Sequence, residues 1–113
     1  MTLDEAVDEI LTTCKDMGWQ REGTHEKIRC FYKHETFSWD CTHCPLTALL
    51  EKKQGKRVSI HDASTAGSSL GITPQDRTIL IYAADNHYDG FFMSKELNEK
   101  VKQVREKLLT LTR

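Results

Sequence analysis

Apolar side chains recur at intervals of three and four residues along most of the chain, a spacing that places them on one face of a helix. The clearest example covers residues 3–17, where acidic residues stand between the apolar positions. These positions are Leu3, Ala6, Val7, Ile10, Leu11, Cys14 and Met17. Thr2 followed by Glu5 matches a capping box, and Gly18 suits the residue that ends a helix. The pattern therefore predicts a helix over roughly 3–17.

Proline and glycine mark the ends of two further predicted helices. Pro45 suits the first turn of a helix, and Gly55 would end it. Thr73 suits an N-cap position in front of Pro74, and the apolar residues that follow carry this helix to about Ala84.

Two more helices are expected on signals of unequal strength. Ser59 or Asp62 could cap a helix that stops at Gly71, but the small polar residues inside it have poor helix propensity. Ser94 is the expected N-cap of a final helix with regular apolar positions. Those positions are Leu97, Val101, Val104, Leu108 and Leu111.

Residues 28–41 alternate between apolar and polar side chains, which is typical of strands. The apolar members are Ile28, Cys30 and Tyr32 in a first run, and Phe37, Trp39 and Cys41 in a second. The segment 34–36 separates the runs and would be the turn of a small hairpin, although it lacks glycine. We therefore expect a mainly α fold: a single domain over 1–113, built as a compact bundle of about five helices with a β-hairpin near residues 28–41.

The overall charge of the chain does not direct it to a polyanion. Lysine and arginine number 16 against 17 acidic residues, so no global field favours nucleic acid or anionic lipid. The start of the chain is acidic and its end is basic. No secretory leader is visible, and the longest apolar run, 79–84, is too short to cross a bilayer. We expect a cytoplasmic protein with no membrane partner and with reduced cysteines.

A cluster of cysteines and histidines is the first candidate for chemistry. Zn²⁺ takes four nitrogen or sulfur ligands in a tetrahedron, and two short-spaced pairs on adjacent structures can supply them. The candidate zinc ligands are Cys30, His34, Cys41 and Cys44. His25 and His43 are rival fourth ligands, and buried cysteines that bind nothing are the alternative.

The pair Cys41 and Cys44 also has the spacing of a redox site. It precedes a helix that opens at Pro45, and a helix N-terminus lowers the pKa of a thiol. Thioredoxin-like proteins place their cysteines this way, with an aromatic residue such as Trp39 nearby. The resemblance covers about six residues, and no βαβ unit follows them.

Residues 85–96 resemble the twelve-residue calcium loop of EF-hands. The residues at ligand positions are Asp85, Asp89, Phe91 and Glu96, the third through its backbone carbonyl. Gly90 stands where the loop turns sharply, and helices are predicted on both sides. His87 departs from the pattern, because imidazole is a poor ligand for calcium. A polar loop between two helices is the alternative.

Residues 66–73 and the helix after them resemble the turn of a helix-turn-helix protein. The second helix would offer Gln75, Arg77 and Thr78 to DNA bases, and few basic residues are near enough to bind phosphate. Arg77 also occupies a position that should be buried in that motif. An ordinary corner between two helices explains the same residues, so nucleic acid is the less favoured partner.

No motif of a hydrolase, a P-loop enzyme or a zinc protease is present, and we expect a protein that is not an enzyme. Aromatic residues dominate the anchors of protein interfaces. The candidates for such a binding surface are Trp39, Phe91 and Phe92. The final helix could instead pair with the same helix of a second copy, giving a homodimer.

Three short motifs carry one resemblance. They are Cys44-Pro45-Leu46-Thr47-Ala48, Leu70-Gly71-Ile72-Thr73 and Ile81-Tyr82-Ala83-Ala84-Asp85-Asn86. Together they are similar to a pattern in small uncharacterised helical proteins of phages and bacteria. The resemblance implies a helical fold, implies no activity, and suggests that Ala84-Asp85-Asn86 is a fold feature. The sequence thus favours a small non-enzymatic binding or regulatory module with a protein partner and no required cofactor; zinc, calcium and DNA binding are the alternatives.

Overall fold

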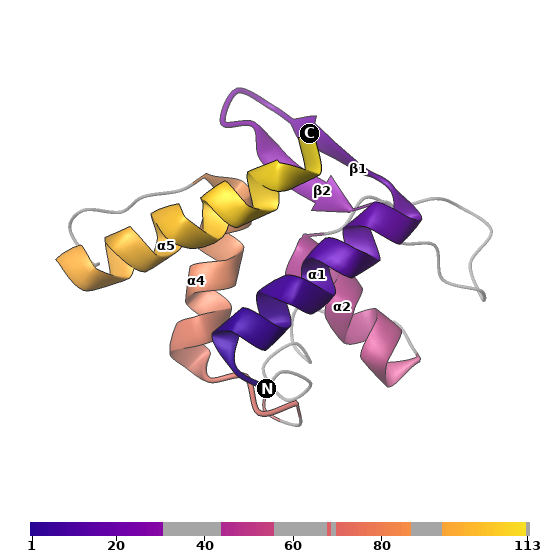
Figure 1. Cartoon of the computed structure of the whole chain (residues 1–113), viewed down its shortest axis with the longest axis horizontal. Coiled ribbons are helices and arrows are strands. Elements are labelled where there is room, and N and C mark those ends of the chain that lie inside the picture. Colours follow the sequence, from indigo (N-terminus) through magenta and orange to yellow (C-terminus); the bar gives the residue numbers. More distant parts are fainter. Residues whose placement is uncertain (31–43, 56–67, 69, 87–93, 113) are drawn as a thin grey trace.

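The computed structural model describes residues 1–30, 44–55, 68, 70–86 and 94–112. In chain order its elements are α1 (Leu3–Met17), β1 (Trp19–Glu22), β2 (Lys27–Cys30), α2 (Pro45–Gln54), α4 (Pro74–Asp85), α5 (Lys95–Leu108) and the 3₁₀ helix η1 (Leu109–Thr112) (Figure 1). The radius of gyration, 13.4 Å, is that of a compact domain of this length. Within the described ranges, no helix is both long and apolar enough to cross a membrane.

The helix ends that local sequence signals predict are confirmed. Around Thr2, the hydroxyl accepts a hydrogen bond from the Glu5 N–H at 3.2 Å, and the Glu5 carboxylate accepts one from the Thr2 N–H at 3.1 Å. The hydroxyl of Thr73 caps α4, and that of Ser94 caps α5. Gly55 follows α2 in the left-handed conformation, with φ of 68°. These caps satisfy backbone groups that have no partner inside a helix.

The prediction of about five helices is confirmed in its coarser form, a mainly helical chain with one small hairpin. Four α-helices occur in the part of the chain that the structure describes. The predicted helix that would stop at Gly71 falls almost wholly outside that part. Only Ser68 and Leu70 of its residues are described.

The position of the hairpin differs from the predicted one. β2 pairs with β1 in antiparallel register, with Trp19 opposite Cys30 and Arg21 opposite Ile28. The turn therefore lies at 23–26, where Gly23 has φ of 76°. A glycine adopts this left-handed conformation without steric cost, and the predicted turn at 34–36 has none. The proposed second strand, near 37–41, lies outside the described residues.

One core joins all of these elements. α1 packs on α2, on α5 and on β2, and α4 packs on α2, α5 and β2 (Figure 1). The largest fully buried apolar side chains are Val7, Ile10, Ile28, Leu49, Leu50, Ile79, Leu80, Val101 and Leu108. They come from both halves of the chain, so burial of these side chains fixes the helices and the hairpin relative to one another.

Arg105 on α5 is a charged residue inside this core. Its side chain is 93% buried, with a relative exposure of 7%. The Nη1 atom donates hydrogen bonds to the carbonyls of Ala83, at 2.9 Å, and Ala84, at 3.4 Å. The Nη2 atom donates to the carbonyl of Glu26 at 3.1 Å. One guanidinium therefore holds the last turn of α4 and the turn of the hairpin together.

Replacing Arg105 with methionine should destabilise the protein by about 3 kcal/mol, because two buried carbonyls and one part-buried carbonyl lose their charged donor. Chemical denaturation measures the free energy of unfolding. The matched control is Lys102→Met, which removes a charge from an exposed position of the same helix and should change that free energy by less than about 0.5 kcal/mol. Equal effects of the two substitutions would contradict the role given to Arg105.

The capping box of α1 should make the stability of the protein depend on pH. Hydrogen bonds from the backbone N–H and the hydroxyl of Thr2 lower the pKa of Glu5 below 4.5. A carboxylate with a lowered pKa stabilises the fold above its ordinary pKa, and this stabilisation is lost as the pH falls through the lowered value. The loss of Tm caused by Glu5→Ala should therefore shrink between pH 6 and pH 3. Ser94→Ala removes a cap that has no ionisable partner, so its effect should not shrink in the same way.

Candidate functional site

Cys14 and Cys30 are both buried in the core, on two elements that pack against each other. Cys14 is on the inward face of α1, where the helical period also places Val7 and Ile10. Cys30 ends β2, in which residues alternate between half-buried and buried. Both residues have a relative exposure of 0%. The two cysteines lie 16 positions apart in the sequence, and the fold joins them.

The side-chain hydrogen bond between Cys14 and Cys30 shifts the pKa values of the two thiols in opposite directions. It raises the pKa of Cys14, and burial raises it further. The same bond lowers the pKa of Cys30, and the ammonium group of Lys52 adds to this effect.

Cys44 lies close to this pair, at the start of α2. Its charge contributes to the raised pKa of Cys14. Burial raises the pKa of Cys44 itself; the backbone N–H groups of Leu46 and Thr47 oppose this effect. The three cysteines that the structure describes thus lie on α1, β2 and the start of α2, which pack against one another.

The predicted zinc set is described only in part. Cys30 and Cys44 lie near the same junction, while His34 and Cys41 are outside the described residues. Among the residues that are described, no three histidine, cysteine, aspartate or glutamate side chains are arranged to hold a metal ion. Of the rival histidines, His25 is exposed in the turn of the hairpin, and His43 is outside the described part. The zinc site stays a prediction.

Cys14 is the residue that the sequence analysis did not assign to this cluster. The C-x-x-C spacing indicated a candidate site at 41–44, but such a spacing identifies only residues that are close in the sequence. Helical periodicity does place Cys14 on the core face of α1, and strand alternation does place Cys30 on the buried face of β2. A search for cysteines on buried faces of different elements would have included Cys14.

The first residue of the predicted calcium loop has a structural role. The carboxylate of Asp85, at the end of α4, forms an ion pair with Arg29 of β2, with 3.3 Å between Nη1 and Oδ1. Asn86 follows in the left-handed conformation, with φ of 54°, and its Nδ2 donates to the His25 carbonyl at 3.1 Å. Glu96 is exposed in the first turn of α5. The remaining predicted ligands, Asp89 and Phe91, lie outside the described residues, so calcium binding stays a prediction.

Arg77, the basic residue that the predicted helix-turn-helix would present to DNA, stabilises the corner before α4. The guanidinium of Arg77 donates to the Ile72 carbonyl at 3.2 Å and to the Ser68 hydroxyl at 3.4 Å. It is half-buried and holds the turn that leads into its own helix. Gln75 and Thr78 are exposed, and the Thr78 hydroxyl donates to the Pro74 carbonyl.

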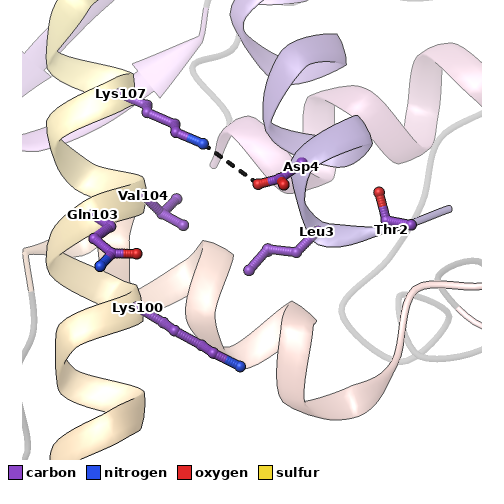
Figure 2. A pocket seen from close by; sticks show the side chains of 7 residues that line it. All are labelled: Thr2, Leu3, Asp4, Lys100, Gln103, Val104 and Lys107. Atoms are coloured by element: carbon purple, nitrogen blue, oxygen red, sulfur yellow. Dashed lines mark hydrogen bonds and ion pairs between the residues drawn. The ribbon is translucent and has the colours of Figure 1, made fainter.

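A surface pocket of about 330 Å³ lies between the start of α1 and the side of α5 that faces it. Its lining residues are Thr2, Leu3, Asp4, Lys100, Gln103, Val104 and Lys107 (Figure 2). Leu3 and Val104 supply its apolar part, one from each helix. Lys107 forms an ion pair with Asp4, with 3.4 Å between Nζ and Oδ1. The pocket thus combines an apolar base with a charged rim at the seam between the two ends of the chain.

A second pocket, of about 440 Å³, lies between α1 and α2. Its residues are Glu9, Thr12, Thr13, Leu49, Lys52 and Lys53. Lys53 and Glu9 close one side of it with an ion pair of 2.9 Å. The other lysine, Lys52, is the one whose charge reaches Cys30. Its lining includes neither Cys14 nor Cys30.

The aromatic residues predicted to form a binding surface, Trp39, Phe91 and Phe92, all lie outside the described residues. Two aromatic side chains that are described, Trp19 and Tyr82, pack against the core. No family model, curated protein or solved structure matches this chain.

The ion pair between Arg29 and Asp85 should couple the stability effects of their substitutions. Both side chains are largely buried, with exposures of 20% and 25%, so the pair is less screened than one at the surface. In a cycle of Arg29→Met, Asp85→Asn and the double variant, we expect a coupling of about 1 kcal/mol in the free energy of unfolding. Additive effects within about 0.3 kcal/mol would show that the contact contributes nothing.

Proposed function

We propose that the protein is a small, non-enzymatic binding module of the cytoplasm, and that its partner is another protein. The observation that carries this proposal is the pocket between α1 and α5. A volume of about 330 Å³ is at the lower end of the range for ligand sites. Its apolar base and polar rim are also the arrangement found at protein interfaces.

The charges of the pocket favour an acidic partner group. Asp4 is already paired with Lys107, whereas no ion pair joins Lys100 to any residue in the described ranges. Lys100 therefore keeps a positive charge beside Leu3 and Val104 (Figure 2). The positive end of the α1 dipole adds to the attraction at the same rim. A peptide side chain that ends in a carboxylate, next to an apolar neighbour, fits this combination.

Both walls of the pocket belong to rigid parts of the fold. The capping box fixes the first turn of α1, and the buried face of Val101, Val104 and Leu108 fixes α5 on the core. Because both helices are already fixed, binding in this pocket costs little conformational entropy. Less of the favourable contact energy is therefore lost on binding. This is the physical basis for expecting a measurable affinity from a small contact.

Replacing Lys100 with glutamate should weaken the binding of an acidic peptide by about tenfold, because a favourable charge contact becomes a repulsive one. The probe is a short synthetic peptide with a leucine between two glutamates, titrated into ¹⁵N-labelled protein and followed by NMR. The amide signals of Leu3, Asp4 and 100–107 should shift. Lys102→Glu makes the same charge change on another side of α5 and should leave the affinity unchanged.

Three results would contradict this proposal: no shift at these amides, equal binding by both variants, or equal binding of a peptide with glutamines in place of the glutamates. Sedimentation of the protein alone tests whether the partner is a second copy of the chain. If the acidic α1 of one copy meets the basic α5 of another, the protein will sediment as a dimer that Lys100→Glu dissociates. That outcome would show that the partner is a second copy of this chain and not a different protein.

A further inference from the structure

Three residues of α5 line the pocket between α1 and α5 in a defined order of charge. Lys100, Val104 and Lys107 supply a cation, an apolar group and a second cation. Figure 2 shows Val104 between the two lysines, whose side chains both extend toward the start of α1. Since a helix rises about 1.5 Å per residue, Val104 lies about 6 Å along the axis from Lys100, and Lys107 lies about 10.5 Å from it. A ligand that contacts all three must match this order and spacing.

An extended peptide can match this spacing with groups of complementary chemistry. Alternate residues of a strand point to the same side, so its first, third and fifth side chains share one face and span about 13 Å. Acidic, apolar and acidic residues at these positions would place one carboxylate near each lysine and the apolar side chain on Leu3 and Val104. The flexible lysine stems can take up the difference of about 3 Å between the two spans.

Asp4 already neutralises one of the two cations. Its Oδ1 atom lies 3.4 Å from Nζ of Lys107, whereas Lys100 has no ion pair among the residues that the structure describes. The capping box holds the first turn of α1, and with it Asp4, beside Lys107. The pair is exposed, with 84% of the Asp4 side chain accessible. Ion pairs of this kind contribute little free energy, so a ligand carboxylate can compete with Asp4.

We propose that the partner presents an extended segment of the pattern acid-x-apolar-x-acid, and that Asp4 competes with its second acidic side chain for Lys107. This inference rests on the proposed function, because it concerns the ligand of the same pocket. A second carboxylate reaches Lys107 only by displacing Asp4, which also repels it. The first carboxylate and the apolar residue therefore supply most of the affinity, and Asp4 limits how many acidic groups the site recognises.

The test compares peptides that are acetylated and amidated, so that only their side chains are charged. One has the sequence Glu-Gly-Leu-Gly-Glu, and the other has glutamine in place of its second glutamate. Each is titrated into ¹⁵N-labelled protein, and the shifts of amides 100–107 give the Kd. Wild-type protein should bind the two peptides with affinities within about twofold of each other. Asp4→Asn should bind the two-acid peptide about fivefold more tightly than wild type does, and the one-acid peptide within about twofold of wild type.

Three controls separate this effect from a general change of charge and from a loose fit. Asp8→Asn removes the same charge from an exposed position of α1 outside the pocket and should leave both affinities within about twofold of wild type. Adding Lys107→Gln to Asp4→Asn should remove the gain for the two-acid peptide. A third peptide, Glu-Leu-Gly-Gly-Glu, turns its apolar residue to the other face and should bind at least about threefold more weakly than the first.

The proposal is overturned by any of four results. They are equal effects of Asp4→Asn and Asp8→Asn, a preference of about fivefold for the two-acid peptide in wild-type protein, a gain that persists in the double variant, or equal binding of the third peptide. The proposed function survives these results if the one-acid peptide shifts the pocket amides and Lys100→Glu weakens its binding. If no peptide shifts these amides, the proposed function fails and this inference fails with it.

Discussion

The buried charge of Arg105 is the constraint on which the arrangement of the other elements depends. A guanidinium removed from water is costly unless its N–H groups find acceptors. Here the acceptors are backbone carbonyls of two separate elements, the last turn of α4 and the hairpin turn. The carbonyls of a helix end lack partners inside the helix and carry partial negative charge, so they suit a cation. The buried guanidinium requires these acceptors, and the carbonyls require its N–H donors. The elements α5, α4 and the hairpin therefore have one stable relative position.

The local parts of this fold could be predicted from the sequence, and the parts that depend on distant contacts could not. Thr2, Thr73 and Ser94 act on N–H groups three residues away, so a short motif contains the whole interaction. The hairpin is different. Trp19–Glu22 shows little alternation, and its strand is defined by pairing with β2 and by contacts such as that of Arg29 with Asp85. Alternation found Ile28 and Cys30 but not their pairing with Trp19–Glu22, and the predicted partner near 37–41 lies outside the described residues.

The candidate sites follow the same rule. Cys30 and Cys44 could be named because they lie near a recognisable spacing, whereas the role of Cys14 depends on the packing of α1 against β2. The acidic start and basic end of the chain were visible, but the pairing of Asp4 with Lys107 is a contact over 103 positions. The motif Ala84-Asp85-Asn86 shows how one sequence fits two interpretations. Its aspartate has the place of a first calcium ligand, and the structure pairs it with Arg29.

The two faces of β2 connect these observations. Ile28 and Cys30 face the core, and the half-buried Arg29 between them reaches Asp85 of α4. Because neighbouring residues of a strand point to opposite sides, the packing of Ile28 and Cys30 in the core fixes the same backbone that positions Arg29. Cys44 lies close enough to Arg29 and Asp85 for their charges to affect its pKa. The buried face of β2 and the ion pair at the end of α4 are therefore parts of one structural unit.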